Sequence, residues 1–191
     1  MKLKLITAIA VCAIFTAPVL AEDMKSLTME GKSVIKAFGG TLKKELVSAM
    51  KSGGPTKAVK VCNIVAPEIA SKVSADKGWI ISRSSHKLRN PDNKPDDFTR
   101  AAIEDFLVRE QGGEKAINLV KTAIVEENGK KIFRMVKAIP TGGVCLTCHG
   151  GKSVKPETVA ILKEHYPDDQ ARGFTAGQMR GVFTLQKILS E

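Results

Sequence analysis

A short glycine-flanked stretch, "GGVCLTCHGG" at residues 142–151, holds the side chains best suited to chemistry. Cys145 and Cys148 stand two residues apart, and His149 follows directly. Zinc usually takes a second ligand pair beside a C-x-x-C, and the sequence has no second C-x-x-C. A thioredoxin-like dithiol usually opens a helix, whereas two glycines follow here. The C-x-x-C-H pattern is the signature of covalent haem attachment, so we favour one haem c, with a dithiol pair, zinc or a structural disulfide as alternatives.

Residues 1–21 have the pattern of a secretory signal peptide. Lys2 and Lys4 precede an apolar run from Leu5 to Phe15. Val19 and Ala21 are small residues at the spacing that a signal peptidase reads. We expect cleavage after Ala21, which places residues 22–191 in the periplasm as a single domain without stable membrane insertion. A short membrane anchor that is retained is the alternative.

Cleavage changes both the thiol count and the charge. It removes Cys12 and leaves Cys62, Cys145 and Cys148, so Cys62 is the odd thiol if haem takes the other two. It also removes two lysines, so the formal net charge falls from +10 to +8. The lysines are spread along the chain, which is typical of a solvated surface. Export argues against a nucleic-acid partner, and the positive charge favours an acidic protein or an anionic membrane face.

The hydrophobic pattern predicts an α+β fold. An amphipathic helix is expected over residues 24–52, and a second helix from Pro55 carries Cys62 on its apolar face, with Pro67 as a possible kink. Asn128 and Gly129 predict a tight turn within a hairpin at residues 116–140. The other expected elements are a strand at 78–84, a loop at 89–97, helices at 98–111 and 156–166, and a last strand at 177–189 that turns helical in an alternative interpretation.

Four stretches together resemble a known family: "VCNIVAPEIA" (61–70), "GWIISRSSHKLRNPDNKPDDF" (78–98), "CLTCHGG" (145–151) and "RGVFTL" (180–185). They resemble the PAS-like c-type haem domains, a family catalogued by domain rather than by function. Its members occur alone in the periplasm or as extracytoplasmic sensing parts of receptors and kinases. The resemblance implies a PAS-like antiparallel sheet with flanking helices and an N-terminal helical extension.

The resemblance also implies the iron ligands. It places His149 on one side of the iron and the sulfur of Cys62 on the other. Independently of the family, an unpaired cysteine can present a soft thiolate to iron, although many buried cysteines are only small hydrophobic residues. Four further side chains are of types that can bind iron, but other roles explain them better. His86 is predicted to be a solvated loop histidine, His165 a helix-end residue, and Met135 and Met179 core residues.

The stretch around "SRSSHKLRNP" supplies cations for an anionic cofactor. Arg83 and Arg89 are predicted to contact the haem propionates, because a guanidinium group matches a carboxylate. An ordinary polar loop with exposed arginines is the alternative. Arg180 is a weaker candidate for the same role.

Two classes of function follow. A thiolate ligand stabilises ferric iron, so we expect low-potential electron transfer with a redox partner protein. The alternative is a redox or diatomic-gas sensing module that acts through a signalling partner. No acid-base constellation for peroxidase chemistry is recognised, so we do not expect an enzyme.

Overall fold

A computed structural model describes residues 17–190 of the chain, and the expected signal peptide lies largely outside this range. The helices are α1 (Ala17–Lys60), α2 (Ala66–Lys77), α3 (Asp97–Gln111), α4 (Leu146–His149) and α5 (Pro156–His165). The strands are β1 (Ile80–Ser84), β2 (Val120–Glu127), β3 (Lys130–Pro140) and β4 (Met179–Ser190). None of the helices in the described range combines the length and apolar composition of a membrane span.

The strands form one four-stranded antiparallel sheet in the order β1-β4-β3-β2. The expected hairpin is confirmed: β2 and β3 meet at Asn128 (φ 54°) and Gly129 (φ 75°), the left-handed pair that a two-residue type I′ turn requires. β4 continues as a strand to Ser190, so the alternative of a helical end is wrong. Pairing with both β1 and β3 satisfies its backbone and explains why it remains extended.

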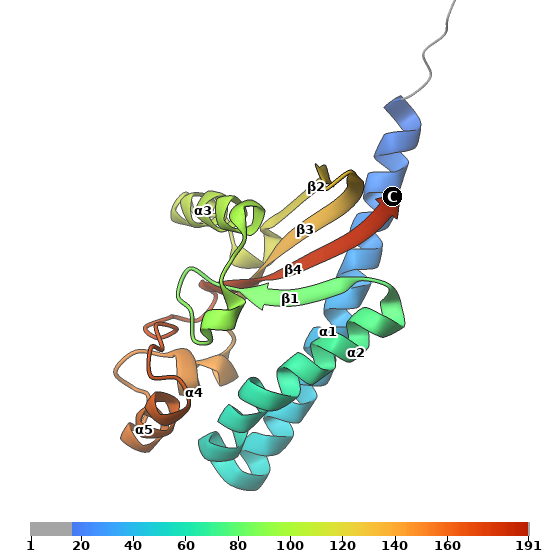
Figure 1. Ribbon diagram of the computed structural model, residues 1–191. Coiled ribbons are helices and arrows are strands. Elements are labelled where there is room, and N and C mark those ends of the chain that lie inside the picture. The colour runs from blue at the N-terminus through green and yellow to red at the C-terminus, as the bar shows by residue number, and fades with distance from the viewer. Residues whose placement is uncertain (1–16, 191) are drawn as a thin grey trace, which may run out of the picture.

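One face of the sheet is covered by α1 and α2, and the other by α3 (Figure 1). On the first face, Val34 and Phe38 of α1 pack with Trp79, Phe133 and other side chains of the sheet. On the second face, three residues of α3 (Ala102, Ile103 and Phe106) pack against Val136, Ala138, Met179 and Val182. Alternation along β3 explains this arrangement, because successive side chains point to opposite faces. The α+β prediction and the PAS-like sheet with flanking helices are confirmed.

The N-terminal helices form a hairpin that extends below the sheet in Figure 1. Helical backbone is interrupted inside α1 at Gly53 and Gly54, and the left-handed φ of 61° at Gly54 suits a residue without a Cβ. Helical backbone resumes at Pro55, as the sequence predicts.

The expected disturbance at Pro67 takes the form of a π-helical turn, Val61–Val65, directly before α2. Pro67 lies in the first turn of α2, where its missing N–H is tolerated. The wider π turn therefore separates α1 from α2, and it carries Cys62.

Candidate functional site

The C-x-x-C-H stretch forms a compact helical turn. A 3-10 turn at Gly143–Cys145 leads into α4, and the i, i+3, i+4 spacing brings Cys145, Cys148 and His149 to one side of it. Both cysteines are half-buried and free of disulfides. Across residues 17–190 no group of three His, Cys, Asp or Glu side chains is arranged to hold a metal ion. The turn thus offers two thiols and one imidazole in a common direction, without further zinc ligands around them.

Gly150 ends this turn for a steric reason. A Cβ added there would lie 2.6 Å from the carbonyl oxygen of Leu146. The same backbone approach produces a hydrogen bond of 3.0 Å from the Gly150 N–H to that oxygen. The glycine after C-x-x-C-H is therefore needed to close the turn.

The imidazole of His149 is held in one orientation. Its Nδ1 lies 2.8 Å from the carbonyl oxygen of Ala171, and since a carbonyl can only accept, Nδ1 carries the proton. Burial, together with the nearby charges of Arg89 and Arg180, lowers the pKa of His149 to about 3, so the ring is neutral. Nε2 therefore carries a lone pair, as in a metal-ligating histidine, and here it accepts a hydrogen bond of 3.4 Å from Nη1 of Arg89.

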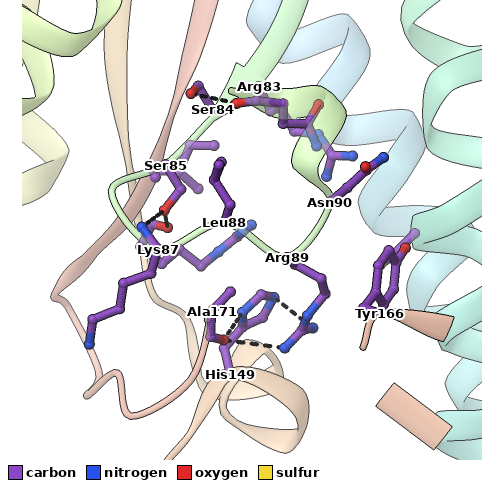
Figure 2. Close-up of a pocket in the computed structure, with 15 residues that line it drawn as sticks. Arg83, Ser84, Ser85, Lys87, Leu88, Arg89, Asn90, His149, Tyr166 and Ala171 are labelled. Carbon is purple, nitrogen blue, oxygen red and sulfur yellow. Dashed lines mark hydrogen bonds between the residues drawn. The ribbon is translucent and has the colours of Figure 1, made fainter. Parts of the chain in front are cut away.

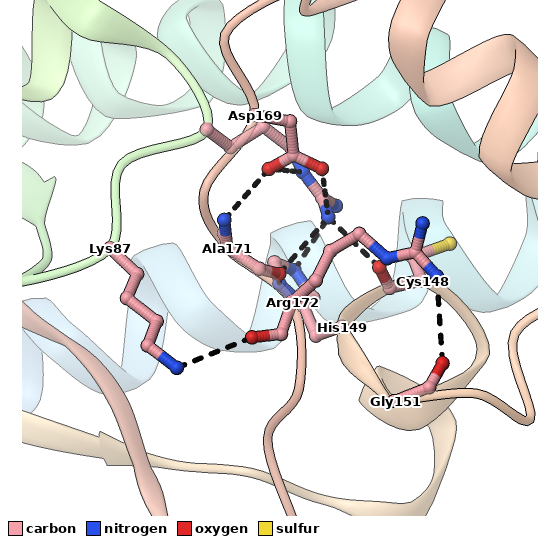
Figure 3. Close-up of polar contacts among 8 residues, drawn as sticks. Lys87, Cys148, His149, Gly151, Asp169, Ala171 and Arg172 are labelled. Carbon is pink, nitrogen blue, oxygen red and sulfur yellow. Dashed lines mark hydrogen bonds and ion pairs between the residues drawn. The ribbon is translucent and has the colours of Figure 1, made fainter.

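A loop at residues 169–174 holds this orientation from the other side. The N–H of Phe174 donates to the carbonyl of His149, and the N–H of Gly173 donates to that of Gly150, both over 3.0 Å. Asp169 accepts from the N–H of Ala171 over 2.9 Å, and this bond fixes the carbonyl that His149 uses. Figure 3 shows how Asp169, Ala171 and His149 lie in this arrangement. Our reading of the sequence missed Asp169 and Ala171, because neither stands in a local pattern that predicts a contact with residue 149.

Arg89 joins this loop to the C-x-x-C-H turn. It pairs through two N–H groups with the carboxylate of Asp169, each over 3.0 Å. It also donates to the carbonyls of Cys148 (2.9 Å) and Ala171 (3.2 Å), and its Nη1 lies 3.4 Å from Nε2 of His149. Arg89 therefore lies beside the imidazole and is already paired within the protein. Its contact with a propionate stays a prediction.

Two adjoining hollows open beside His149, with about 600 and 640 Å³ of space that includes part of the solvent at their mouths. α1 supplies much of the apolar wall. Figure 2 shows the polar side of the first hollow. The residues common to both hollows are Cys62, Arg83, Arg89, His149, Tyr166 and Arg180.

Cys62 reaches these hollows from the π turn. Its thiol is free and half-buried, and it lines the same two hollows as His149. Burial, and then the proximity of Cys62, raise the pKa of Tyr166 to about 12. Burial chiefly raises the pKa of Cys148, and Cys62 adds to this. The fold thus brings together the unpaired thiol and the C-x-x-C-H turn, as the sequence predicts.

Two arginines of the hollows have no anionic partner among the described residues. Arg83 stacks over the ring of Phe38 at 5.6 Å, and burial lowers its pKa. The Nε of Arg180 is buried without a hydrogen-bond partner. Since buried donors are nearly always satisfied in folded proteins, the Nε of Arg180 fits a ligand that carries a carboxylate. Arg180 was the weaker candidate in the sequence, yet it is the one with an unsatisfied buried donor for such a group.

The other candidate ligands lie elsewhere. Met135 and Met179 are fully buried in the two cores, and His165 is the last residue of α5, as predicted. His86 was predicted to be a solvated loop residue, and this is wrong. Its ring is half-buried and packs edge-on against Phe174 at 5.7 Å, with Nδ1 unpartnered, and burial lowers its pKa.

The sheet, its covering helices and the hollow between α1 and the C-x-x-C-H turn define a PAS-like α+β domain with one cysteine- and histidine-lined site. The chain belongs to the Tll0287-like family, whose model matches residues 14–186. Among solved structures it is similar to the cyanobacterial heme-protein Tll0287, with a TM-score of 0.61 and 22% identity over 89% of this chain and 97% of that one. No curated protein matches it significantly.

Proposed function

We propose that this protein is a periplasmic c-type cytochrome domain that carries one covalently bound haem and transfers electrons at low potential. The observation that carries the proposal is the tautomer of His149: its Nδ1 donates to the Ala171 carbonyl, so Nε2 keeps its lone pair in a side chain that lines the same hollow as Cys62. The similar cyanobacterial protein Tll0287 is a heme-protein, and this similarity supports the same cofactor here.

The residues present fit this group. The thiols of Cys145 and Cys148 would attach it, and the imidazole of His149 and the sulfur of Cys62 would bind its iron. The unpartnered Arg180 and the partly enclosed Arg83 offer cations for its two carboxylates. When bound, haem supplies reversible one-electron chemistry.

The chain's own residues set the conditions for that chemistry. Ala171 fixes the tautomer and direction of the His149 ring, and Arg89 with Asp169 fixes Ala171. The apolar wall from α1 limits the access of water, which changes the potential by lowering the local dielectric. A single haem held by His149 and Cys62 would serve one-electron transfer, so we assign electron transfer with a redox partner.

Covalent attachment is tested on denaturing gels stained for haem. The exported protein is expected to give a stained band, and the double variant Cys145→Ser, Cys148→Ser is expected to lose it. Haem that acidic solvent extracts freely from the wild type would contradict the proposal. N-terminal sequencing of the periplasmic fraction tests the location, with Glu22 as the expected first residue.

Iron ligation is tested with Cys62→Ala, which should keep the covalent band but change the ferric absorption spectrum. The midpoint potential should rise, because the thiolate that stabilises ferric iron is absent. Ile64→Ala is the matched control, since this side chain lies on the same π turn and is 58% exposed. A Cys62→Ala variant with the wild-type spectrum and potential would reduce Cys62 to a packing residue.

A further inference from the structure

The helical hairpin below the sheet in Figure 1 carries a concentration of positive charge. Residues 41–77 of this hairpin hold seven lysines, all exposed, and three acidic residues, which is a net charge of +4 of the +10 of the whole chain. Within residues 17–190 none of these lysines forms an ion pair. Outside the hairpin, Arg109 and Arg134 each pair with two carboxylates. The hairpin therefore presents uncompensated positive charge to solvent.

An exposed isoleucine lies among these charges. Ile64 is 58% exposed on the π turn, and the exposed Lys60 and Lys57 lie one and two turns before it on the same side of the helix. Glu68, one turn later, is the nearest acidic residue of this exposed side. An apolar centre with a polar rim is the composition of a protein interface. We call Lys57, Lys60 and Ile64 the hairpin patch.

The hairpin patch lies on the outer side of the segment that walls the hollow. Val59 and Cys62 come from this same segment, and both line the second hollow. Ile64 stands two residues from Cys62 in one π turn. A partner that contacts Ile64 is therefore about one turn of backbone away from the proposed iron ligand. Because electron transfer slows steeply with distance, this position suits exchange with the bound haem.

We propose that the hairpin patch is the docking surface for an acidic redox protein. This inference rests on the proposed function, because it requires a haem that exchanges electrons. Opposite charges steer two proteins together and orient them, which raises the association rate. An anionic membrane fits this surface less well, because membrane-surface helices enter the lipid with Trp, Phe or Leu. Residues 41–77 contain no aromatic residue, and their two leucines, Leu42 and Leu46, line the hollow.

The test uses flavodoxin, an acidic one-electron carrier, as the probe. Its dissociation constant from the ferric holoprotein is measured by calorimetry with oxidised flavodoxin, so that no electron passes. The double variant Lys57→Gln, Lys60→Gln should weaken binding about fivefold to tenfold at about 10 mM salt. The difference should narrow at about 0.1 M salt, because the Debye length falls from about 30 Å to about 10 Å. Ile64→Ala should weaken binding at both salt concentrations, because its contact is apolar.

The chain offers matched controls outside the hairpin. The double variant Lys115→Gln, Lys131→Gln removes the same two charges from exposed positions that form no ion pair within residues 17–190. Ile117→Ala removes a side chain of matching exposure, 57%. Both control variants should change the dissociation constant less than about twofold. A loss in the lysine control equal to that in Lys57→Gln, Lys60→Gln would overturn the proposal, because net charge alone would then explain the binding.

Electron transfer gives a second readout. Reduced flavodoxin gives up one electron, and the iron is reduced from ferric to ferrous. The stopped-flow rate should fall in the hairpin variants, while their ferric spectra and midpoint potentials stay at the wild-type values.

The outcomes separate this inference from the proposed function. If the hairpin variants bind flavodoxin as the wild type does, the docking surface is overturned, whatever the haem does. If binding depends on the hairpin patch but the protein carries no haem that flavodoxin reduces, the proposed function fails, and the redox role of the surface fails with it. Sedimentation with phosphatidylglycerol vesicles that Lys57→Gln, Lys60→Gln abolishes, with flavodoxin binding unchanged, would assign the surface to a membrane and overturn the proposal.

Discussion

Replacing Asp169 by asparagine tests whether the loop at residues 169–174 supports the site. The Asp169 and Arg89 side chains are 7% and 11% exposed, so their ion pair is largely buried. Removing one partner of a buried pair costs about 3–5 kcal/mol, because the other charge remains buried and unpaired. Asparagine still accepts from the N–H of Ala171, which places the expected loss near the lower end, at about 3 kcal/mol.

Urea denaturation of the holoprotein, followed by far-UV circular dichroism, measures this loss. With an m-value of about 2 kcal/mol/M, the midpoint should fall by about 1.5 M at unchanged m. Asp97→Asn is the matched control, since its pair with Arg100 is exposed and the loss should stay below about 1 kcal/mol. If Asp169→Asn lowers the midpoint no more than Asp97→Asn, the pair does not hold the loop as we argue.

Three further predictions concern the frame of the site. A hydrogen bond from Lys187 lowers the pKa of Glu30 in the folded protein. The ionised Glu30 therefore contributes its full stabilisation above the unfolded pKa, near 4.5, and this stabilisation is lost as the pH falls through the folded pKa. In Glu30→Gln, the free energy of unfolding measured in denaturation curves should depend less on pH in this acidic range. Gly150→Ala should reduce stability by about 1–3 kcal/mol and the haem yield with it, whereas Gly151→Ala, which meets open space, should change neither in the same assays. Phe38→Ala should cost about 3–5 kcal/mol in urea denaturation, because this side chain is 1% exposed in the core beneath the sheet; a loss below 1 kcal/mol would contradict this packing.

Local patterns predicted most elements of the fold. Helical periodicity, the glycine pair at 53–54 and the Asn128-Gly129 turn act over a few residues, where backbone sterics and near-neighbour contacts decide the conformation. The C-x-x-C-H stretch is equally local, since its three reactive side chains come together within one helical turn. These features could therefore be predicted from the sequence.

Periodicity did not identify the π turn before α2. The apolar spacing of this region fits an α-helix, and the apolar pattern alone does not distinguish a π turn from an α-helical one. The sequence pattern also gave the wrong environment for His86: this residue stands in a polar stretch, but its ring packs against that of Phe174. For His86 the deciding contact comes from another segment of the chain.

The sequence by itself determined the reactive groups of this protein: two thiols and an imidazole in one turn, an unpaired cysteine at position 62, and candidate arginines at positions 83, 89 and 180. Only the tertiary structure decided how these groups are used. It paired Arg89 with Asp169 across 80 residues, fixed the His149 ring through the contact of its Nδ1 with Ala171, and left the Nε of Arg180 without a partner among residues 17–190. Such choices depend on long-range packing, because a side chain's partner is set by which segments meet in space, and spacing along the chain does not carry that information.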